Sequence, residues 1–413
     1  MQQKDPGQPL KDFASLQNEP SVTSLSKRRS FIHAAVARFG TTLVQRSPIG
    51  VSTASDATPG HPKGNPPGSD KKIGFALVGL GKLTLDELLP AFAHCRYCLP
   101  VALVSGDAAK AAKVAQQYGI ASSHIYNYQN FDDIRNNLDV DVAYIVLPNN
   151  MHEAFTTRAA QASKHVLCEK PMSTSAASAQ RMIDACKEAN KKLMIAYRIQ
   201  YEPKNSLLQQ WVREEKQGKV RLIEMVNVLK LTDPNVWRLK KDMGGGPLFD
   251  IGIYCLNTAR FLLGTEPEWV NASMYSTPND PRFKEVEEAV LFQMGFPNGV
   301  LVNGVSSFAL QQERRYRCLA EDGWVGLENA FAYEGLQLQS SQPDVPQLED
   351  ENHFALEMDH FAQCILQDKP PYTPGEEGLQ DHRIMEAIFQ SAQEQKRVML
   401  QKVEGMDVYR NTK

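Results

Sequence analysis

Between residues 71 and 195, short apolar runs alternate with segments whose apolar residues recur every three or four positions. The runs have the length of strands, and the intervening segments have the period of amphipathic helices. Because the runs are apolar throughout, both of their faces are expected to be buried, which is typical of a parallel sheet between two layers of helices. The alternation predicts a Rossmann-type α/β domain with right-handed crossovers. The predicted strands are 73–78, 101–104, 142–147, 165–168 and 193–196, and the predicted helices are 110–118, 153–163, 175–189 and a segment that begins near Leu83.

The pattern changes beyond about residue 200, where apolar and polar residues alternate one by one. Turn sequences such as 297–299 and 321–323 separate these stretches, and together they predict a large, mostly antiparallel sheet in an α+β domain. Helices are expected on one face of this sheet, and the open face is expected to pair with another subunit in a dimer or tetramer. The predicted strands are 222–231, 268–275, 289–296, 300–308, 315–320 and 324–328, and the predicted helices are 251–263, 356–367 and 379–396.

The length of 413 residues fits two domains and a tail. We expect the Rossmann domain to span 71–195 and a substrate-binding and oligomerisation domain to span 196–413. Residues 1–70 lack periodicity and are rich in Ser, Thr, Pro, Gly and Gln. Their last part, 53–70, has too few apolar residues to fold alone and predicts an arm or linker.

Arg28 and Arg29 stand in the sequence Lys-Arg-Arg-Ser-Phe-Ile, which resembles a twin-arginine export signal. An apolar stretch follows at 31–44, although Arg38 interrupts it. We expect export to the periplasm, and the alternative is a basic tail on a cytoplasmic protein.

The charge and cysteine content exclude some classes of partner. The net charge of −3 does not favour nucleic acid or an anionic membrane, and no apolar run is long enough to span a bilayer. The seven cysteines are expected to form neither a zinc knuckle nor a disulfide framework, and we expect no metal site.

A glycine turn follows the first predicted strand and opens a helix. In this turn Gly79 permits a sharp bend, and Gly81 lets the backbone approach a pyrophosphate, while Lys82 and Leu83 begin the helix. Thr84 stands where the nucleotide-binding fingerprint has its third glycine. Because a strand, a turn and a helix occur in the right order, we interpret the turn as a dinucleotide site.

The residues after the second predicted strand bear on the choice of cofactor. Ser105 ends the strand, and Gly106 and Lys110 follow it. A hydroxyl and a cation suit the 2′-phosphate of NADP. Asp107 is the competing feature, since a carboxylate that reached the ribose would favour NAD. We predict NADP, with NAD as the less favoured alternative.

Two further segments carry candidate chemistry. Lys170 precedes a proline at the end of the fourth predicted strand, so it is expected in extended backbone at the edge where α/β sheets bind ligands. Asp250 and Tyr254 follow a glycine run and Pro247, and their spacing of four places them on one helix face. Together these three residues predict an acid–base site.

These motifs resemble the glucose–fructose oxidoreductase/inositol dehydrogenase/MocA family from about Lys71 to near the C-terminus. The resemblance is nearest to the glucose–fructose oxidoreductase branch, because Tyr254 stands where many family dehydrogenases carry histidine. Gln200 departs from that branch, which has histidine there. The resemblance implies an NADP-dependent sugar oxidoreductase with catalytic Lys170, Asp250 and Tyr254. It also implies that further residues contact the cofactor or shape the sugar pocket, namely Tyr128, Leu147, Pro148, Asn149, His152, Glu169, Arg198, Trp237 and Arg238.

The expected chemistry is oxidation of a sugar at its anomeric carbon to a lactone. Tyr254 would act as the general base, Lys170 would favour its phenolate form, and Asp250 would orient the sugar or Lys170. If the nucleotide stays bound, a second sugar must take the hydride, which gives ping-pong kinetics. The alternatives are a sugar dehydrogenase with exchangeable cofactor and a non-catalytic nucleotide-binding protein. The non-catalytic alternative is disfavoured because Lys170 and Tyr254 are both present.

Overall fold

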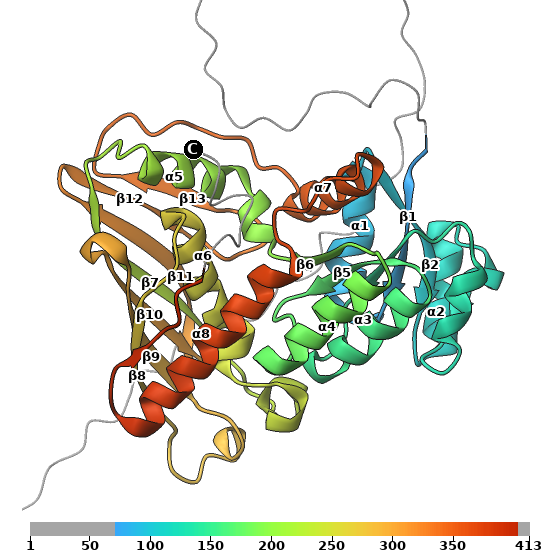
Figure 1. Ribbon diagram of the computed structural model, residues 1–413, viewed down its shortest axis with the longest axis horizontal. Coiled ribbons are helices and arrows are strands. Elements are labelled where there is room, and N and C mark those ends of the chain that lie inside the picture. Colours follow the sequence, from blue (N-terminus) through green and yellow to red (C-terminus); the bar gives the residue numbers. More distant parts are fainter. Residues whose placement is uncertain (1–70, 404–413) are drawn as a thin grey trace, which may run out of the picture. The chain divides into compact units, whose positions relative to one another are not determined.

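The computed structural model describes residues 71–403. The twin-arginine-like motif and the predicted arm lie outside these described residues. The described part of the chain is built around two sheets (Figure 1). The predicted fold class, a parallel Rossmann sheet followed by a large, mostly antiparallel sheet, is confirmed.

The first sheet has six parallel strands in the order β3-β2-β1-β4-β5-β6. The strand order reverses at β1, which pairs with both β2 and β4, so ligands are expected at the carboxyl ends of these strands. The two-residue strand β3 was not predicted, because two residues show no periodicity. The strands are β1 (Ile73–Val78), β2 (Cys98–Val104), β3 (Ile125–Tyr126), β4 (Val142–Ile145), β5 (His165–Glu169) and β6 (Leu193–Ala196).

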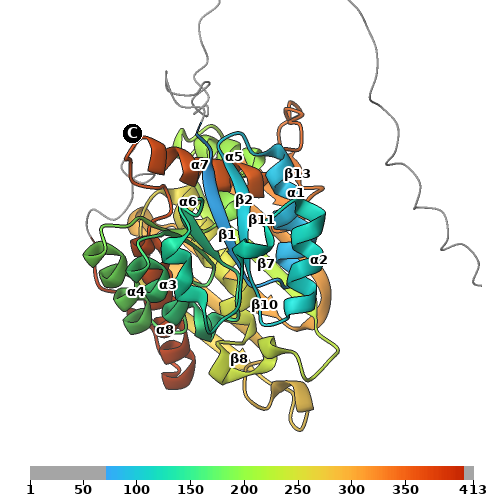
Figure 2. The ribbon, with the colours of Figure 1, turned by 90° about the vertical axis from the view of Figure 1, so that its right-hand side faces the viewer.

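Helices cover both faces of the first sheet (Figure 2). α3 (His152–Gln161) and α4 (Ala176–Glu188) pack on one face. The other face carries α1 (Leu89–Ala91), α2 (Ala108–Tyr118) and α7 (His353–Leu366).

The position of α7 corrects the predicted division of the chain. We expected everything beyond residue 195 to belong to the second domain, but Phe354, Met358 and Phe361 of α7 are buried against the first sheet. The helical stretch that connects β1 to β2 covers only part of this face, and α7 packs beside it.

The second sheet has eight strands in the order β13-β12-β11-β7-β10-β9-β8-β14. All neighbours are antiparallel except β7 and β10, which run parallel because a long crossover with a helix and a hairpin separates them in the chain. The strands are β7 (Val220–Lys230), β8 (Trp269–Tyr275), β9 (Ala289–Gly295), β10 (Leu301–Ser307), β11 (Ala309–Ala320), β12 (Gly323–Glu328), β13 (Gln337–Ser340) and β14 (Val398–Met399).

One face of the second sheet is covered by α5 (Pro203–Arg213), α6 (Ile253–Leu263) and α8 (Gly375–Glu394). α8 packs on β8 and also on α4, so it joins the two sheets (Figure 1). This arrangement brings one end of β7 and the start of α6 to the carboxyl edge of the first sheet, where the candidate site lies.

The opposite face of the second sheet presents an apolar row. Leu222, Leu301 and Leu319 are neighbours across β7, β10 and β11, and Trp324 continues the row on β12. On the same face Leu291 is 54% exposed and Leu301 is 45% exposed. A single chain thus leaves apolar side chains of this face in contact with water.

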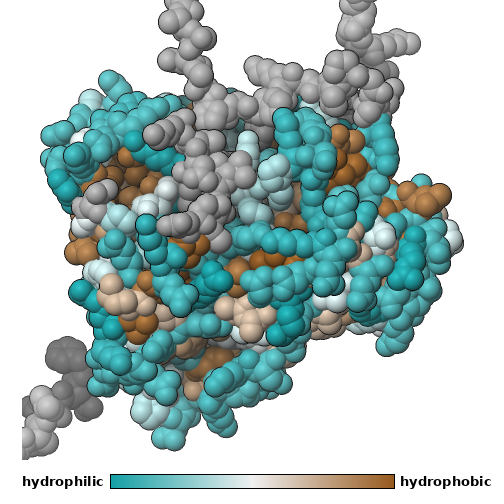
Figure 3. All heavy atoms as spheres, viewed as in Figure 1, coloured by the Kyte–Doolittle hydropathy of each residue, from teal (hydrophilic) through white to brown (hydrophobic). Residues whose placement is uncertain are grey.

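Elsewhere the visible surface is more polar. In the view of Figure 3, hydrophobic residues lie in small separate patches among hydrophilic ones. Among residues 71–403, no helix combines the length and the apolar character needed to cross a bilayer.

Candidate active site

A cavity of about 690 Å³ lies where the carboxyl edge of the first sheet meets the second sheet. Every residue predicted to bind cofactor or to act in catalysis lines it, with one exception, His152. The lining residues that were predicted are Gly79, Gly81, Lys82, Leu83, Ser105, Gly106, Lys110, Tyr128, Leu147, Pro148, Asn149, Glu169, Lys170, Arg198, Trp237, Arg238, Asp250 and Tyr254.

The glycine turn is shaped for close approach of a ligand. Gly79 has φ +104°, and a Cβ there would lie 2.3 Å from the carbonyl oxygen of Val146, so only glycine fits. A Cβ on Gly81 would meet no atom within 4 Å, because this residue faces the cavity. The buried Thr84 hydroxyl donates a hydrogen bond to the Gly79 carbonyl at 2.6 Å. The threonine in the third fingerprint position therefore holds the turn closed.

The structure shows what Asp107 does at the cofactor end. Its carboxylate accepts the backbone N–H of Lys110 at 2.9 Å and caps α2, while its own N–H donates to the Ser105 hydroxyl at 3.0 Å. The carboxylate is thus engaged by the helix that it begins. Ser105, the exposed Lys110 and the α2 N-terminus remain as anion-binding groups beside the cavity, which fits a 2′-phosphate.

His152 does not line the cavity, which corrects its predicted role as a cofactor contact. Its side chain is fully buried, and its two ring nitrogens lie 2.8 Å from the carbonyl oxygen of Leu147 and 3.0 Å from that of Pro171. Burial lowers the pKa of His152 despite these carbonyl neighbours. The imidazole thus ties two of the loops that form the cavity wall to each other.

Lys170 and Asp250 form the centre of the site. The Lys170 ammonium donates to the backbone carbonyl of Asp250 at 2.8 Å and lies 3.6 Å from its carboxylate. The other carboxylate oxygen accepts the Arg238 guanidinium at 2.8 Å. The glycine run supports this arrangement, because Asn149 donates to the Gly244 carbonyl at 2.8 Å and so links it to the first sheet.

The charges in this centre stabilise one another. Burial lowers the pKa of Lys170, but Tyr254, Asp250 and Glu169 outweigh it, so the pKa is raised overall. Burial would raise the pKa of Asp250, but Arg238 and Lys170 outweigh it, so that pKa is lowered overall. Lys170 is therefore protonated and Asp250 ionised at neutral pH.

Tyr254 lies close to two cations. The Lys170 ammonium is 4.6 Å from the centre of its ring, and Arg198 donates to its hydroxyl at 3.3 Å. Arg198 is itself held by the carbonyl oxygens of Phe331 at 2.7 Å and Ala332 at 3.0 Å. A negative charge on the Tyr254 oxygen would therefore be stabilised by two fixed positive charges.

Two stretches of the chain match models of one family. Residues 73–197 match the oxidoreductase family with an NAD-binding Rossmann fold, and residues 206–325 match the GFO/IDH/MocA C-terminal domain. The chain belongs to the GFO/IDH/MocA family. The family predicted from the sequence motifs is thus confirmed.

Several relatives of known kind are similar over most of their length. The D-xylose 1-dehydrogenase [NADP(+)] of Haloarcula marismortui is 32% identical over 80% of this chain and 94% of its own. The crystal structure of aldose-aldose oxidoreductase from Caulobacter crescentus complexed with glycerol has 41% identity and a TM-score of 0.78, and the match covers 80% of this chain and all of that one. A levoglucosan dehydrogenase structure with 21% identity and a TM-score of 0.69 shares the fold.

Further residues of this GFO/IDH/MocA member line the cavity, and the sequence motifs did not predict them. Asn227 on β7 is buried and donates to the Ile251 carbonyl at 2.9 Å. Arg314 on β11 and Tyr333 in the loop after β12 also line the cavity. Alternation along the strands could have shown on which side of the sheet Asn227 and Arg314 lie. It could not show that this side lines the cavity, because that depends on how the two sheets pack.

Gln200, which departs from the glucose–fructose oxidoreductase branch, does not line the cavity. Its buried side chain donates to the Asn257 side chain at 2.8 Å. The departure therefore lies behind the site, in the polar contacts that support α6.

Proposed function

We propose that this protein is an NADP-dependent sugar oxidoreductase that oxidises an aldose at C1 to a lactone. The observation that carries the proposal is the packing of Lys170, Asp250 and Tyr254 at one end of a cavity whose other end is a glycine turn. This geometry joins an acid–base group to a dinucleotide site. Family membership and relatives that act on sugars support the substrate class.

NADP is the proposed cofactor. The capping role of Asp107 leaves Ser105 and Lys110 to meet a 2′-phosphate, and the relative from Haloarcula marismortui carries NADP(+) in its name. When bound, the nicotinamide of NADP accepts the hydride from the sugar carbon.

The side chains of this site remove the proton of the sugar hydroxyl. Tyr254 accepts the proton of the C1 hydroxyl, so the C1–O bond becomes the carbonyl of the lactone. This step needs Tyr254 as the phenolate, and Lys170 and Arg198 supply positive charge beside its ring and its hydroxyl. Asp250 is held by Arg238 and keeps the Lys170 ammonium in place beside the tyrosine.

The finer proposal is a reaction of two sugars through a retained nucleotide, as in the glucose–fructose oxidoreductase branch. Tyr254 in the general-base position and the similarity to an aldose-aldose oxidoreductase favour it. The alternative, a dehydrogenase that releases NADPH in each turnover, is favoured by the similarity to the D-xylose 1-dehydrogenase.

The nucleotide content of the purified protein distinguishes the two. We expect nucleotide absorbance after gel filtration and release of NADP(H) on denaturation. We also expect lactone formation from a pair of aldoses without added nucleotide. Protein that is free of nucleotide and turns over only with added NADP+ would establish the dehydrogenase instead.

The open face of the second sheet supports a homo-oligomer, because exposed Leu291 and Leu301 would be buried in a dimer or tetramer. The matched test is Leu291→Lys with Leu301→Lys against Leu138→Lys, since Leu138 is an exposed leucine of the first domain. Light scattering should show an oligomer for the wild type and the Leu138 variant and a smaller species for the double variant. A wild type that is monomeric at micromolar concentration would refute the proposal.

We also propose export to the periplasm through Arg28 and Arg29. A nucleotide-retaining enzyme would have to fold around its cofactor before export, which is the order that a twin-arginine route permits. The test is fractionation of cells that make the wild type or the Arg28→Lys, Arg29→Lys variant. If both stay in the cytoplasm with an intact N-terminus, the export proposal fails.

A further inference from the structure

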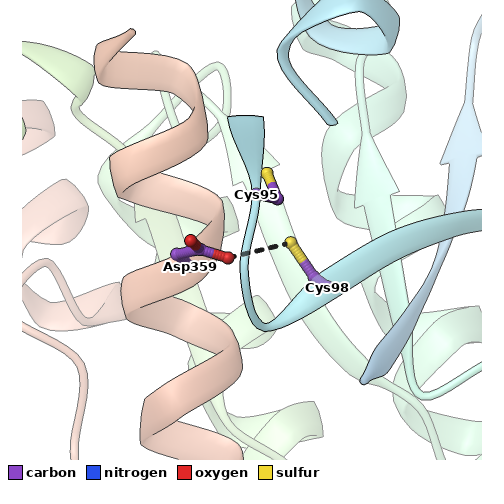
Figure 4. Close-up of side chains that lie close together, drawn as sticks. All are labelled: Cys95, Cys98 and Asp359. Carbon is purple, nitrogen blue, oxygen red and sulfur yellow. Dashed lines mark hydrogen bonds between the residues drawn. The ribbon is translucent and has the colours of Figure 1, made fainter. Parts of the chain in front are cut away.

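Two buried cysteines and an aspartate meet on the side of the first sheet that α7 covers (Figure 4). Cys95 lies just before β2, Cys98 is the first residue of β2, and Asp359 lies on α7. Their spacing is C-x-x-C, which our cysteine prediction overlooked. None of the three lines the catalytic cavity, so the cluster is separate from the site described above.

The geometry of the cluster fits one small cation. One potential ligand atom from each residue lies within 4.8 Å of the others, and Cys98 Sγ is 3.6 Å from Asp359 Oδ1. A tetrahedral zinc ion with bonds of about 2.3 Å to sulfur and about 2.0–2.2 Å to oxygen holds its ligand atoms roughly 3.5–3.8 Å apart. The three side chains therefore need only small shifts to share an ion. Two cysteines separated by two residues are also a common chelating unit of zinc sites.

The charges of the cluster also indicate a cation. The Asp359 carboxylate accepts the backbone N–H groups of Arg96 at 2.8 Å and Tyr97 at 2.9 Å. It forms no ion pair with any lysine, arginine or histidine between residues 71 and 403. The half-buried Asp359 carboxylate therefore has no side-chain counter-charge among these residues, and a divalent cation would supply one.

We propose that Cys95, Cys98 and Asp359 bind one Zn²⁺ ion. Binding exchanges the two thiol protons for the ion, since Zn²⁺ takes two thiolate sulfurs and one carboxylate oxygen and two protons leave to solvent. A water molecule fills the fourth position, which the half-buried Asp359 leaves accessible. This site revises our expectation that the chain binds no metal.

The ion cross-links α7 to the first sheet. The two cysteines and Asp359 are more than 250 residues apart in the chain, so the link joins segments that only tertiary packing brings together. α7 begins at His353, and its next residue, Phe354, lines the catalytic cavity. The zinc ion therefore stabilises a wall of the cavity without touching the reacting groups.

The experiment measures metal in the full chain. Wild-type protein is exposed to ZnCl₂ alone in reducing buffer, freed of excess metal and analysed for zinc, and Co²⁺ is then substituted. We expect one zinc per chain, a thiolate-to-cobalt charge-transfer band, and a lower melting temperature after chelation. Cys98→Ser and Asp359→Asn should lose stoichiometric metal. Cys186→Ser, a matched change at a buried free thiol in α4, should retain it.

Two results would overturn the proposal. One is a wild-type protein without stoichiometric zinc whose melting temperature does not respond to chelator. The other is an intact mass two hydrogens too low that recovers on reduction, which would show a Cys95–Cys98 disulfide instead. Both results come from the wild type, so they do not depend on whether a variant folds.

Discussion

The two ends of the cavity are built in different ways. At the nucleotide end, Gly79, Gly81 and Ser105 come from two consecutive strand ends, and their backbone groups form the site. At the sugar end, Lys170, Asp250 and Arg238 come from separate segments of the chain, and their charged side chains form the site. One end thus depends on local backbone geometry, and the other depends on charge pairing between distant segments. Substitutions should therefore act differently at the two ends.

The largest effect is expected at the sugar end. Tyr254→Phe keeps the ring and removes the acid–base oxygen, so kcat should fall about 10²–10⁴-fold. Lys170→Met should cost a similar factor, and the double variant should be little worse than either single one. Steady-state kinetics with nucleotide binding as a control measures this. A Tyr254→Phe enzyme with near-normal turnover would rule out the mechanism.

The contact that Glu287 makes with the helical segment before Tyr254 should make the stability of the protein depend on pH. Glu287 accepts the backbone N–H of Leu248 at 3.2 Å, and burial raises its pKa to about 7. An acid whose pKa is raised by folding binds its proton more tightly in the native state. Its contribution to stability is thus complete below its ordinary pKa, is lost as the pH rises towards 7, and stays lost above.

Glu287→Gln keeps the acceptor for Leu248 and removes the ionisation. The free energy of unfolding of the variant, measured relative to the wild type, should be higher above pH 7 than at pH 5. The difference should be about 3 kcal/mol at most, since one pKa unit corresponds to about 1.4 kcal/mol. Chemical denaturation of both proteins at the two pH values measures the difference. Glu285→Gln, an exposed acid two residues away, is the control. An equal response in both variants would contradict the prediction.

Arg238 tests charge pairing at the sugar end directly. Arg238→Met leaves the Asp250 carboxylate without its 2.8 Å partner. Hydrogen bonds to charged groups contribute about 1.5–3 kcal/mol, so kcat/KM should fall roughly tenfold to a hundredfold. NADP affinity should change less than sugar turnover. The reverse order would mean that Arg238 serves the nucleotide and not the sugar.

At the nucleotide end, Ser105→Asp should change cofactor choice. The new carboxylate would repel a 2′-phosphate and could accept the ribose hydroxyl of NAD, so we expect about a tenfold shift in the ratio of affinities towards NAD. Titration with both nucleotides measures this. An unchanged ratio would show that the 2′-phosphate is held elsewhere.

The smallest effect is expected for Thr84→Val, which removes the hydrogen bond to the Gly79 carbonyl without changing the size of the side chain. The net value of such a bond is about 1 kcal/mol, which corresponds to roughly fivefold weaker NADP binding. Thr84→Ser should retain most of the affinity. If valine and serine bind alike, the hydroxyl does not hold the turn.

Much of this protein is determined by the sequence alone. Apolar periodicity predicted both sheets and most helices, because the spacing of apolar residues shows whether one face or both faces of an element are buried. The glycine turn, Lys170 before proline and the Asp250–Tyr254 spacing predicted the two ends of the cavity, since each is a local motif, and the family resemblance added other residues of its lining. His152 was misplaced because a motif shows which residues are close in the chain, not which way a buried ring points.

Tertiary structure decided the rest. Only the fold shows that α7 crosses back to the first sheet, that Arg314 and Tyr333 reach the cavity, and that Cys95 and Cys98 meet Asp359. It also assigns Asp107 to a helix cap, so a residue that local reasoning left open as a ribose contact is already bonded to Lys110. The physical reason is that these contacts join segments far apart in sequence, and their partners are chosen by the packing of two sheets, which no local pattern encodes.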